Sequence, residues 1–317
     1  MKPIVLSSID LSVYKNEFKI LKKKSKFLLA KNYSEIKNKI KNADIYVAYA
    51  KFIFDKSIID QANKLKFVIN PATGSDHIDI KYLKKKNIIY HDLSKEYKLI
   101  KEFTATSELT FGSLICLIRN IIPSTLSVKK GNWLREKFKG FQLKGKVFGI
   151  IGYGRLGKIA HKIAEGFQMK VIAYDTDKKK IKNKNIKVSL NHLLKKSDII
   201  TTHIHLTKKN YKIIDKSYFN KMKKGSIFIN SSRGAIVNEK DLISSLKSKK
   251  LNGAILDVID GEWLNKRKFK NHLLIKYAKK NNNLLITPHI GGSTIESIVY
   301  ARKFVIKKII KYLKYGL

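Results

Sequence analysis

The chain has 317 residues, 44% of them hydrophobic, which suggests about two globular domains and excludes general disorder. Its formal net charge is +43, from 67 basic and 24 acidic residues. Because the basic residues are spread over nearly every segment and no nucleic-acid-binding motif accompanies them, we expect weak, salt-sensitive contact with polyanions but no specific nucleic-acid binding.

Short apolar runs alternate with lysine-rich helical patterns over residues 1–101, which predicts a parallel α/β sheet of the open, flavodoxin-like kind. The expected strands are Ile4–Leu6, Phe27–Leu29, Tyr46–Tyr49, Phe67–Ile69 and Ile88–Tyr90, and helical spacing marks residues 33–41 and 57–64. The Pro- and Gly-containing loop Asn70–Asp79 follows the fourth strand, where ligands usually bind in such sheets. A plain βα turn explains this loop equally well.

Residues 102–121 carry apolar side chains at helical spacing. They predict one long helix that crosses between two domains, and Pro123 is expected to end it. Cys116 lies in this apolar pattern and, as the single cysteine, makes no internal disulfide. We interpret it as a small buried hydrophobe.

The stretch from Lys146 to Asp177 has the form of a dinucleotide-binding unit. An apolar run is followed by Gly152, Gly154 and Gly157 in GxGxxG spacing, then by a helical pattern and a second apolar run that ends on Asp175. The glycines permit a tight turn, close approach of a pyrophosphate and close helix–strand packing, while the helix N-terminus attracts phosphate. Asp175 can accept hydrogen bonds from the ribose hydroxyls and repels a 2′-phosphate, which favours NAD. An ordinary βα turn is the alternative, but the strand, helix and acidic residue all agree with a dinucleotide.

Beyond residue 177 the alternation of strands and helices continues. The expected strands are 198–202, 226–230, 253–258 and 284–287, and the expected helices are 190–196, 216–223 and 239–249. With the two strands of the dinucleotide unit, six strands make a second doubly wound domain. A last helix, Ile295–Tyr315, is expected to return to the first domain. The predicted organisation is a substrate domain of residues 1–101 plus 288–317 and an inserted Rossmann domain of residues 102–287.

Three strand ends of the second domain carry residues that the fold alone does not need, namely Arg233, Glu262 and His289. Arg233 can bind a substrate carboxylate and polarise a carbonyl, and His289 can exchange a proton near neutral pH. Glu262 can hold the other imidazole nitrogen. Singly, each has a plain alternative: Arg233 could form a surface ion pair, Glu262 could be a solvated loop acid, and His289 could lie at a helix start. Because all three follow parallel strands at their carboxyl ends, beside the cofactor, together they predict a reaction site.

At these residues the chain resembles the D-isomer-specific 2-hydroxyacid dehydrogenase family, over essentially its full length. The resemblance rests on GYGRLG with Asp175, on SSRGAIVNEKDL, on the Asp257-to-Glu262 spacing, on TPHIGG and on TGSDHID in the first domain. These motifs occur in the family's order at similar distances. His205 and Trp263 stand where the family usually has proline.

The resemblance implies a role for each matching residue of the reaction site. Arg233 would bind the substrate carboxylate and carbonyl oxygen, and His289 would be the acid/base, paired with Glu262. Backbone N–H groups near Thr73, Gly74 and Ser75 would bind the substrate carboxylate. No metal ion is implied.

Further residues are implied in cofactor binding. Asp257 would hold the nicotinamide carboxamide, and Arg155 and Leu156 would contact the pyrophosphate. His203 would line the cofactor cleft, and Gly292 is expected beside it.

The expected reaction is NAD-dependent hydride transfer between nicotinamide and C2 of a D-2-hydroxy acid or 2-keto acid. D-3-Phosphoglycerate is the favoured substrate, because many short members of the family act on it and a positive site suits a phosphate. Glyoxylate or hydroxypyruvate reduction is the alternative. The sequence ends soon after its last helix, so we expect no C-terminal regulatory domain and no serine feedback. The family also implies a homodimer built through the cofactor domain and residues 102–140.

Two other classes of protein are weighed against this enzyme. A non-catalytic NADH-sensing protein would share the fold and the three residues, but such relatives use partner grooves and tails that the sequence does not suggest. A polyanion-binding protein would explain the net charge of +43 but not the motifs. No apolar stretch approaches the ~20 residues of a membrane span, no signal peptide is evident, and the single cysteine suits a reducing compartment, so we expect a cytoplasmic protein with no membrane partner.

Overall fold

The computed structural model describes residues 1–263 and 269–316 of the chain. The chain folds into two compact units, one formed by residues 1–103 and 295–317 and the other by residues 104–294. We call these the first unit and the second unit. The first unit resumes after Thr294 and not at residue 288, so the loop that carries His289 belongs to the second unit.

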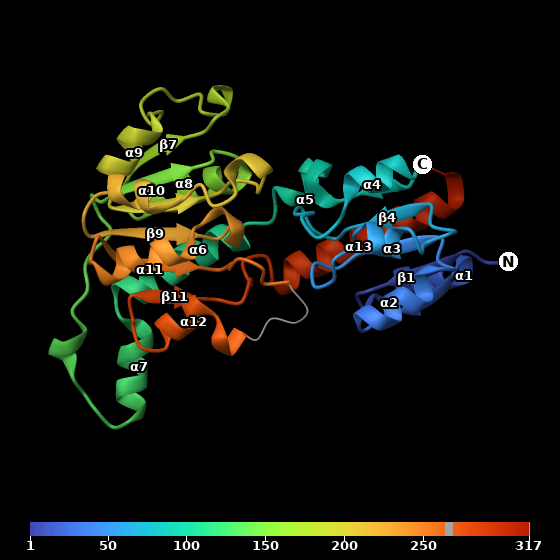
Figure 1. The fold of residues 1–317 in the computed structure, drawn as a ribbon, viewed down its shortest axis with the longest axis horizontal. Coiled ribbons are helices and arrows are strands. Elements are labelled where there is room, and N and C mark those ends of the chain that lie inside the picture. The colour runs from blue at the N-terminus through green and yellow to red at the C-terminus, as the bar shows by residue number, and fades with distance from the viewer. Residues whose placement is uncertain (264–268, 317) are drawn as a thin grey trace. The chain divides into compact units, whose positions relative to one another are not determined.

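The first unit contains a five-stranded parallel sheet in the order β2-β1-β3-β4-β5 (Figure 1). Its strands are β1 (Ile4–Ser7), β2 (Lys26–Leu29), β3 (Ile45–Val47), β4 (Phe67–Ile69) and β5 (Ile89–His91). Its helices are α1 (Lys15–Lys24), α2 (Tyr33–Ile40), α3 (Lys56–Ile59), α4 (Ile80–Lys85), α5 (Tyr97–Ile100) and α13 (Ile295–Tyr315), with the 3-10 turn η1 (Leu93–Lys95). This strand order is the flavodoxin-like one, as the sequence predicted.

Successive residues of each strand face opposite sides of this sheet, which gives the first unit two apolar layers. Val5 belongs to the layer that α13 covers through Phe304, Val305, Ile306 and Ile309. Leu6, the next residue, belongs to the other layer, where Ile36 and Ile40 of α2 are buried. The final helix therefore packs on the first unit, as its periodicity indicated.

The expected helix over residues 57–64 was wrong in its length, because α3 ends at Ile59. After it the chain continues in i,i+3 turns, with the Gln61 N–H bonded to the Ile58 carbonyl and the Ala62 N–H to the Ile59 carbonyl. These tighter turns bury Ala62 and Leu65 under the sheet. Core packing has overridden the helical spacing here.

The second unit contains a six-stranded parallel sheet in the order β11-β10-β9-β8-β6-β7 (Figure 1). Its strands are β6 (Val147–Ile151), β7 (Lys170–Tyr174), β8 (Ile199–Thr202), β9 (Ser226–Asn230), β10 (Leu251–Leu256) and β11 (Leu284–Ile286). Ala173 in β7 also forms a parallel bridge with Lys187. With that bridge counted as a short strand, the order is the 3-2-1-4-5-6 of dinucleotide folds plus one strand at the far edge. The chain changes direction across the sheet between β6 and β8, where such folds bind the cofactor.

Helices cover both faces of this sheet, and apolar residues alternate between the two layers. The helices are α6 (Ala105–Ile118), α7 (Ile121–Lys129), α8 (Arg155–Gly166), α9 (Leu190–Lys196), α10 (Lys216–Lys221), α11 (Glu239–Lys247) and α12 (Leu273–Ala278). The 3-10 turns are η2 (Arg135–Phe138), η3 (Lys178–Lys180), η4 (Lys208–Asn210), η5 (Gly234–Ile236) and η6 (Phe269–Asn271). Ile227 and Ile229 of β9 pack in the layer with α6 and α8, whereas Phe228 packs in the layer with α10 and α11.

The expected single helix over residues 102–121 was wrong at its end, because the structure has two helices there. Asn120 has a φ of +51°, which breaks the helix one residue after the cap of α6. Pro123 lies in the first turn of α7, where proline is tolerated because its missing N–H would have no helical partner. Figure 1 shows α7 extending away from the sheet of its unit.

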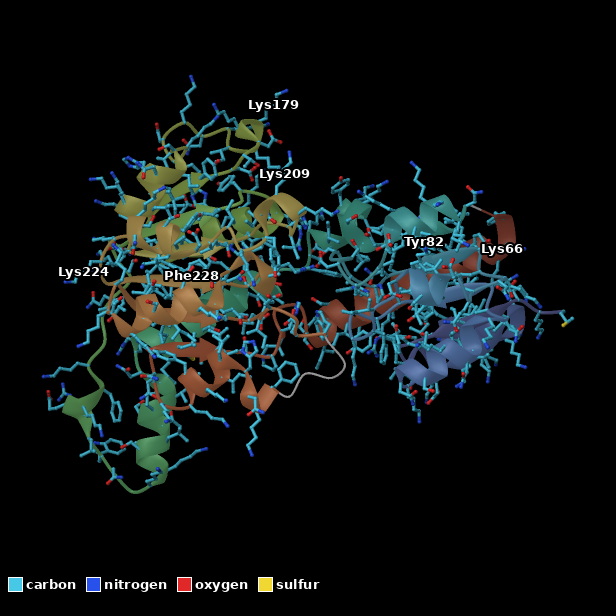
Figure 2. The ribbon with its side chains drawn as sticks, viewed as in Figure 1. Lys66, Tyr82, Lys179, Lys209, Lys224 and Phe228 are labelled. Atoms are coloured by element: carbon cyan, nitrogen blue, oxygen red, sulfur yellow. The ribbon has the colours of Figure 1, made fainter. Side chains whose placement is uncertain are left out.

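The lysine excess lies on the outside of the molecule. Figure 2 shows Lys179, Lys209 and Lys224 pointing outward at separate places around the second unit. Phe228 of β9, by contrast, is fully buried. Within the described residues, no single helix is both long and apolar enough to cross a membrane. One bent pair, Tyr97–Ile118 with Ile121–Lys129, meets that criterion on length and composition alone.

Candidate active site

The glycine-rich turn between β6 and α8 has the shape that a dinucleotide requires. Gly152 has a φ of +92°, and a Cβ there would lie 2.4 Å from the His203 carbonyl oxygen. A Cβ on Gly157 would lie 2.3 Å from the Gly152 carbonyl oxygen, so helix and turn pack too closely for a side chain. At Gly154, by contrast, a Cβ would meet nothing within 4 Å, which leaves the backbone open to a ligand.

Helix α8 begins at Arg155, directly after this turn, and Gly154 as its N-cap offers no side-chain acceptor. The first N–H groups of the helix and its dipole are therefore available to an anion. Burial lowers the pKa of the Arg155 guanidinium. The Leu156 carbonyl accepts a 3.1 Å hydrogen bond from the Ser107 hydroxyl, which ties the turn to α6.

Asp175 follows β7 and is 8% exposed. Its carboxylate accepts hydrogen bonds from the backbone N–H groups of Tyr153 and Asp177, both at 2.8 Å, and lies 3.5 Å from the Lys180 amine. A carboxylate has about four acceptor sites, so capacity for ribose hydroxyls is left. The bond to Tyr153 holds this carboxylate beside the glycine-rich turn.

His203 follows β8 and approaches the same turn from the other side. Its backbone N–H donates to the Ile151 carbonyl at 2.7 Å, and its Nε2 lies 3.2 Å from the Thr201 hydroxyl. Burial lowers the pKa of the imidazole to about 4, so the ring is neutral at physiological pH. Among the described residues its buried Nδ1 has no hydrogen-bond partner. Together with the open Gly154 and the α8 N-terminus, this orphaned nitrogen fits a polar cofactor in the turn.

Arg233 lies in the turn after β9, and Asn230 shapes that turn. The buried Asn230 side chain accepts from the Ser232 N–H at 3.0 Å and donates to the Arg233 carbonyl at 2.9 Å. The Arg233 guanidinium is half-buried and donates to the Ser232 carbonyl at 2.7 Å. Asn230 was not among the residues predicted for the site, although a buried polar residue at a strand's carboxyl end is a signal for a shaped turn.

Asp257 follows β10 and organises the loop after β11. One of its oxygens accepts from the Thr287 hydroxyl at 2.6 Å and the Ile290 N–H at 2.8 Å, and the other from the Gly291 N–H at 2.7 Å. Three bonds leave about one acceptor site on the carboxylate. The hydrogen bond from Thr287 to Asp257 was not predicted from the sequence. Gly292 follows directly, exposed and in open space.

His289 is held in this loop with a φ of +55°, which is uncommon for a residue with a side chain. Its backbone N–H donates to the Asp257 carbonyl at 2.8 Å. Its Nδ1 lies 2.7 Å from Glu262 Oε1, and both side chains are largely buried, at 26% and 14% exposed. Trp263 packs against the imidazole, with ring centroids 5.2 Å apart. The pair and the indole fix the ring, so Nε2 is the nitrogen left for proton exchange.

The loops after β9 and β10 meet at Gly234. A Cβ there would lie 2.0 Å from the Ile259 carbonyl carbon and 2.4 Å from the Asp260 nitrogen. The turn of Arg233 therefore packs directly on the segment between Asp257 and Glu262. Arg233, Glu262 and His289 all belong to the second unit.

Thr73, Gly74 and Ser75 belong to the first unit, in the loop after β4. The buried Asn70 side chain donates to the Gly74 carbonyl at 2.9 Å and to the Tyr90 hydroxyl at 3.3 Å. The Tyr90 hydroxyl in turn donates to Asp92 at 3.1 Å. This network gives the loop a defined shape that a plain turn would not need.

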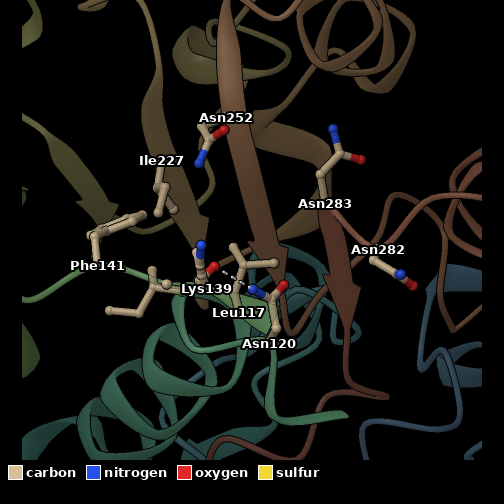
Figure 3. A pocket seen from close by; sticks show the side chains of 10 residues that line it. Leu117, Asn120, Lys139, Phe141, Ile227, Asn252, Asn282 and Asn283 are labelled. Carbon is tan, nitrogen blue, oxygen red and sulfur yellow. Dashed lines mark hydrogen bonds between the residues drawn. The ribbon is translucent and has the colours of Figure 1, made fainter. Parts of the chain in front are cut away.

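A cavity of about 410 Å³ in the second unit lies apart from these residues (Figure 3). It is lined by Ile227 and Asn252, near the amino ends of β9 and β10, and by Asn283 just before β11. Because the candidate site follows the carboxyl ends of the same strands, this cavity is at the opposite edge of the sheet. Within residues 1–263 and 269–316, no group of three His, Cys, Asp or Glu side chains is placed to hold a metal ion.

Comparison with known proteins identifies the family. The family model "D-isomer specific 2-hydroxyacid dehydrogenase, NAD binding domain" matches residues 111–291. A D-3-phosphoglycerate dehydrogenase of Methanocaldococcus jannaschii is 35% identical over 284 residues, 88% of this chain and 52% of that protein. A glyoxylate reductase of Thermococcus litoralis is 34% identical over 286 residues, 87% of this chain and 82% of that protein. The chain belongs to the D-isomer-specific 2-hydroxyacid dehydrogenase family.

A solved relative agrees with this assignment. The D-lactate dehydrogenase of Aquifex aeolicus, determined with NAD and lactic acid, has a TM-score of 0.85 at 26% identity, covering 99% of this chain and 96% of that one. The fold, the membership of an NAD-dependent oxidoreductase family and NAD as the cofactor are thereby shown. The chain spans about half the length of the Methanocaldococcus protein.

Proposed function

We propose that this dehydrogenase acts on D-3-phosphoglycerate and its 2-keto acid, with Arg233, Glu262 and His289 as the catalytic residues. The observation that carries the catalytic part is the 2.7 Å contact between His289 Nδ1 and Glu262 Oε1 in an NAD-binding fold. A carboxylate in that position stabilises the imidazolium and leaves Nε2 to exchange a proton with the C2 oxygen.

NAD, when bound, supplies the hydride acceptor or donor. Arg233 would bind the substrate carboxylate through its planar fork and polarise the C2 carbonyl, and His289 would take or give the hydroxyl proton. The backbone N–H groups of Thr73, Gly74 and Ser75 would bind a substrate carboxylate. The proposed cofactor contacts are Gly152, Gly154, Arg155, Leu156, Gly157, Asp175, His203, Asp257 and Gly292.

The choice of substrate is supported by similarity and charge. The Methanocaldococcus relative is named as a D-3-phosphoglycerate dehydrogenase, and the chain carries a net charge of +43, which attracts a phosphorylated acid. The Thermococcus relative, a glyoxylate reductase, supports reduction of glyoxylate or hydroxypyruvate as the alternative.

The test follows NADH absorbance for wild type, His289→Ala and, as a matched control, the exposed Lys209→Ala. Each is assayed with 3-phosphoglycerate, D-lactate, D-glycerate, glyoxylate, hydroxypyruvate and 2-oxoglutarate. We expect 3-phosphoglycerate to have the highest kcat/KM and His289→Ala to lower kcat by about 10²- to 10⁴-fold, with NADH affinity unchanged. Faster turnover of another acid would identify that acid as the substrate in place of D-3-phosphoglycerate. Tight NADH binding without turnover of any acid would favour the NADH-sensing class instead.

We also propose a homodimer formed through α7 and the segment after it. No residue of α7 is buried, although four of its nine residues, Ile121, Ile122, Leu126 and Val128, are large and apolar. Trp133, just beyond, is 85% exposed. Apolar side chains in such density on a surface favour a partner surface. Sedimentation of wild type and Leu126→Lys tests this: a wild-type monomer would contradict it.

We further propose that the protein works in the cytoplasm. Its only cysteine, Cys116, is a free thiol within the second unit, which suits a reducing compartment. Cell fractionation with an antibody to the protein would test this.

A further inference from the structure

The second unit contains a second histidine–carboxylate pair, formed by His272 and Glu239. His272 Nε2 lies 3.2 Å from Glu239 Oε2, and the two side chains are only 1% and 9% exposed. Burying a carboxylate and an imidazole is unfavourable unless their polar atoms are used. The attraction between the two side chains is therefore not enough to explain why both are buried.

The other carboxylate oxygen of Glu239 contacts the backbone close to Glu262 of the candidate active site. Glu239 Oε1 accepts a 2.8 Å hydrogen bond from the Asp260 backbone N–H, 21 residues further along the chain. Asp260 lies in the turn in which the Glu262 N–H reaches back to the Ile259 carbonyl at 3.4 Å. Glu239 thus holds the backbone of the turn from which the Glu262 side chain extends to His289.

His272 connects this carboxylate to a rigid element. Its Nδ1 accepts from the Leu274 N–H at 3.3 Å and caps α12, whose Leu274 is fully buried. Because Nδ1 accepts a hydrogen bond, a neutral ring carries its hydrogen on Nε2, the nitrogen that lies 3.2 Å from Glu239 Oε2. Contacts therefore run from α12 through His272 and Glu239 to Asp260.

We propose that Glu239 and His272 are positioning residues that hold the turn of Glu262 so that its carboxylate meets His289. Neither residue touches the imidazole of His289. Their effect passes through the Asp260 N–H and the two residues that follow it. The inference rests on the proposed acid/base role of His289 and extends it to the support of its partner.

The test compares kcat and KM, measured separately, for wild type, Glu239→Ala and Glu239→Gln. In Glu239→Ala the turn loses its acceptor, and we expect kcat to fall by up to about 100-fold with NADH affinity unchanged. A displaced Glu262 impairs the reaction of bound substrate more than its binding, so KM should change little while kcat falls. Glu239→Gln keeps an oxygen for the Asp260 N–H and should lie between the other two. If the alanine variant does not fold, Glu239→Gln alone tests the proposal.

Asp198→Ala is the matched control. Asp198 also accepts a backbone hydrogen bond across the chain, from the Val147 N–H at 2.8 Å, but at the amino ends of the strands. It should lower the melting temperature without lowering kcat. Glu239 variants that behave like Asp198→Ala, while His289→Ala is inactive, would overturn the positioning role alone. Full turnover by His289→Ala would overturn the catalytic proposal and this inference with it.

Discussion

Replacing Gly234 by alanine tests whether the packing of two loops sets the geometry of the active site. A Cβ at this position would lie 2.0 Å from the Ile259 carbonyl carbon and 2.3 Å from its oxygen, whereas ordinary contact begins at 3.4 Å. Both atoms belong to backbone, so no side-chain rotation can relieve the overlap. The segment must move by roughly 1.4 Å, the difference between 2.0 Å and 3.4 Å.

That displacement would change the position of Glu262 in the reaction site. The Ile259 carbonyl accepts the Glu262 N–H, so moving it moves the residue that holds His289. A misplacement of about 1 Å lowers catalysis by on the order of 10²-fold, and overpacking of this kind costs about 1–3 kcal/mol of stability. We therefore expect Gly234→Ala to fold, to bind NADH normally and to lose about 100-fold in kcat.

The assay combines steady-state kinetics, NADH titration by fluorescence and thermal unfolding. Gly166→Ala is the control, since a Cβ on Gly166 at the end of α8 would meet nothing within 4 Å. It should behave as wild type in all three measurements. Wild-type kcat in a folded Gly234→Ala protein would refute the reasoning, because the turn of Glu262 would then tolerate displacement.

Three further predictions follow from single contacts. Asp257→Asn places an amide hydrogen against the Gly291 N–H, so that bond is lost at a cost of about 1–3 kcal/mol, and hydrogen exchange at Gly291 should accelerate; unchanged exchange would contradict the anchoring role. Asp175→Ala removes the charge opposed to a 2′-phosphate and should raise the NADPH-to-NADH ratio of kcat/KM at least about tenfold, or 1.4 kcal/mol; an unchanged ratio would place discrimination elsewhere. His203 has a folded pKa of about 4, below the unfolded 6.5, so its contribution to stability is complete above pH 6.5 and is lost as pH falls toward 4. The urea midpoint of His203→Gln should therefore fall less than that of wild type between pH 7 and 4.5, and parallel curves would count against a buried neutral ring.

Two errors of the sequence-based prediction concern where helices end. The spacing over residues 57–64 is helical, yet Leu65 is drawn into the core and the helix stops at Ile59. Pro123 is a helix breaker in the interior, but it is harmless in the first turn of α7, once Asn120 has already ended α6. Packing decided the first case, and the backbone conformation of Asn120 decided the second.

The sequence by itself determined the two parallel sheets, the glycine-rich turn and the strand ends that carry Arg233, Asp257 and His289. These features depend on periodicity and on the steric needs of single residues, which are local properties of the chain. Tertiary structure decided which side chains meet: Glu262 with His289 across 27 residues, Thr287 with Asp257 across 30, and Glu239 with the Asp260 N–H across 21. A hydrogen bond requires its two atoms within about 3 Å of each other, and only packing of the loops on their sheet brings residues so far apart in sequence to that distance.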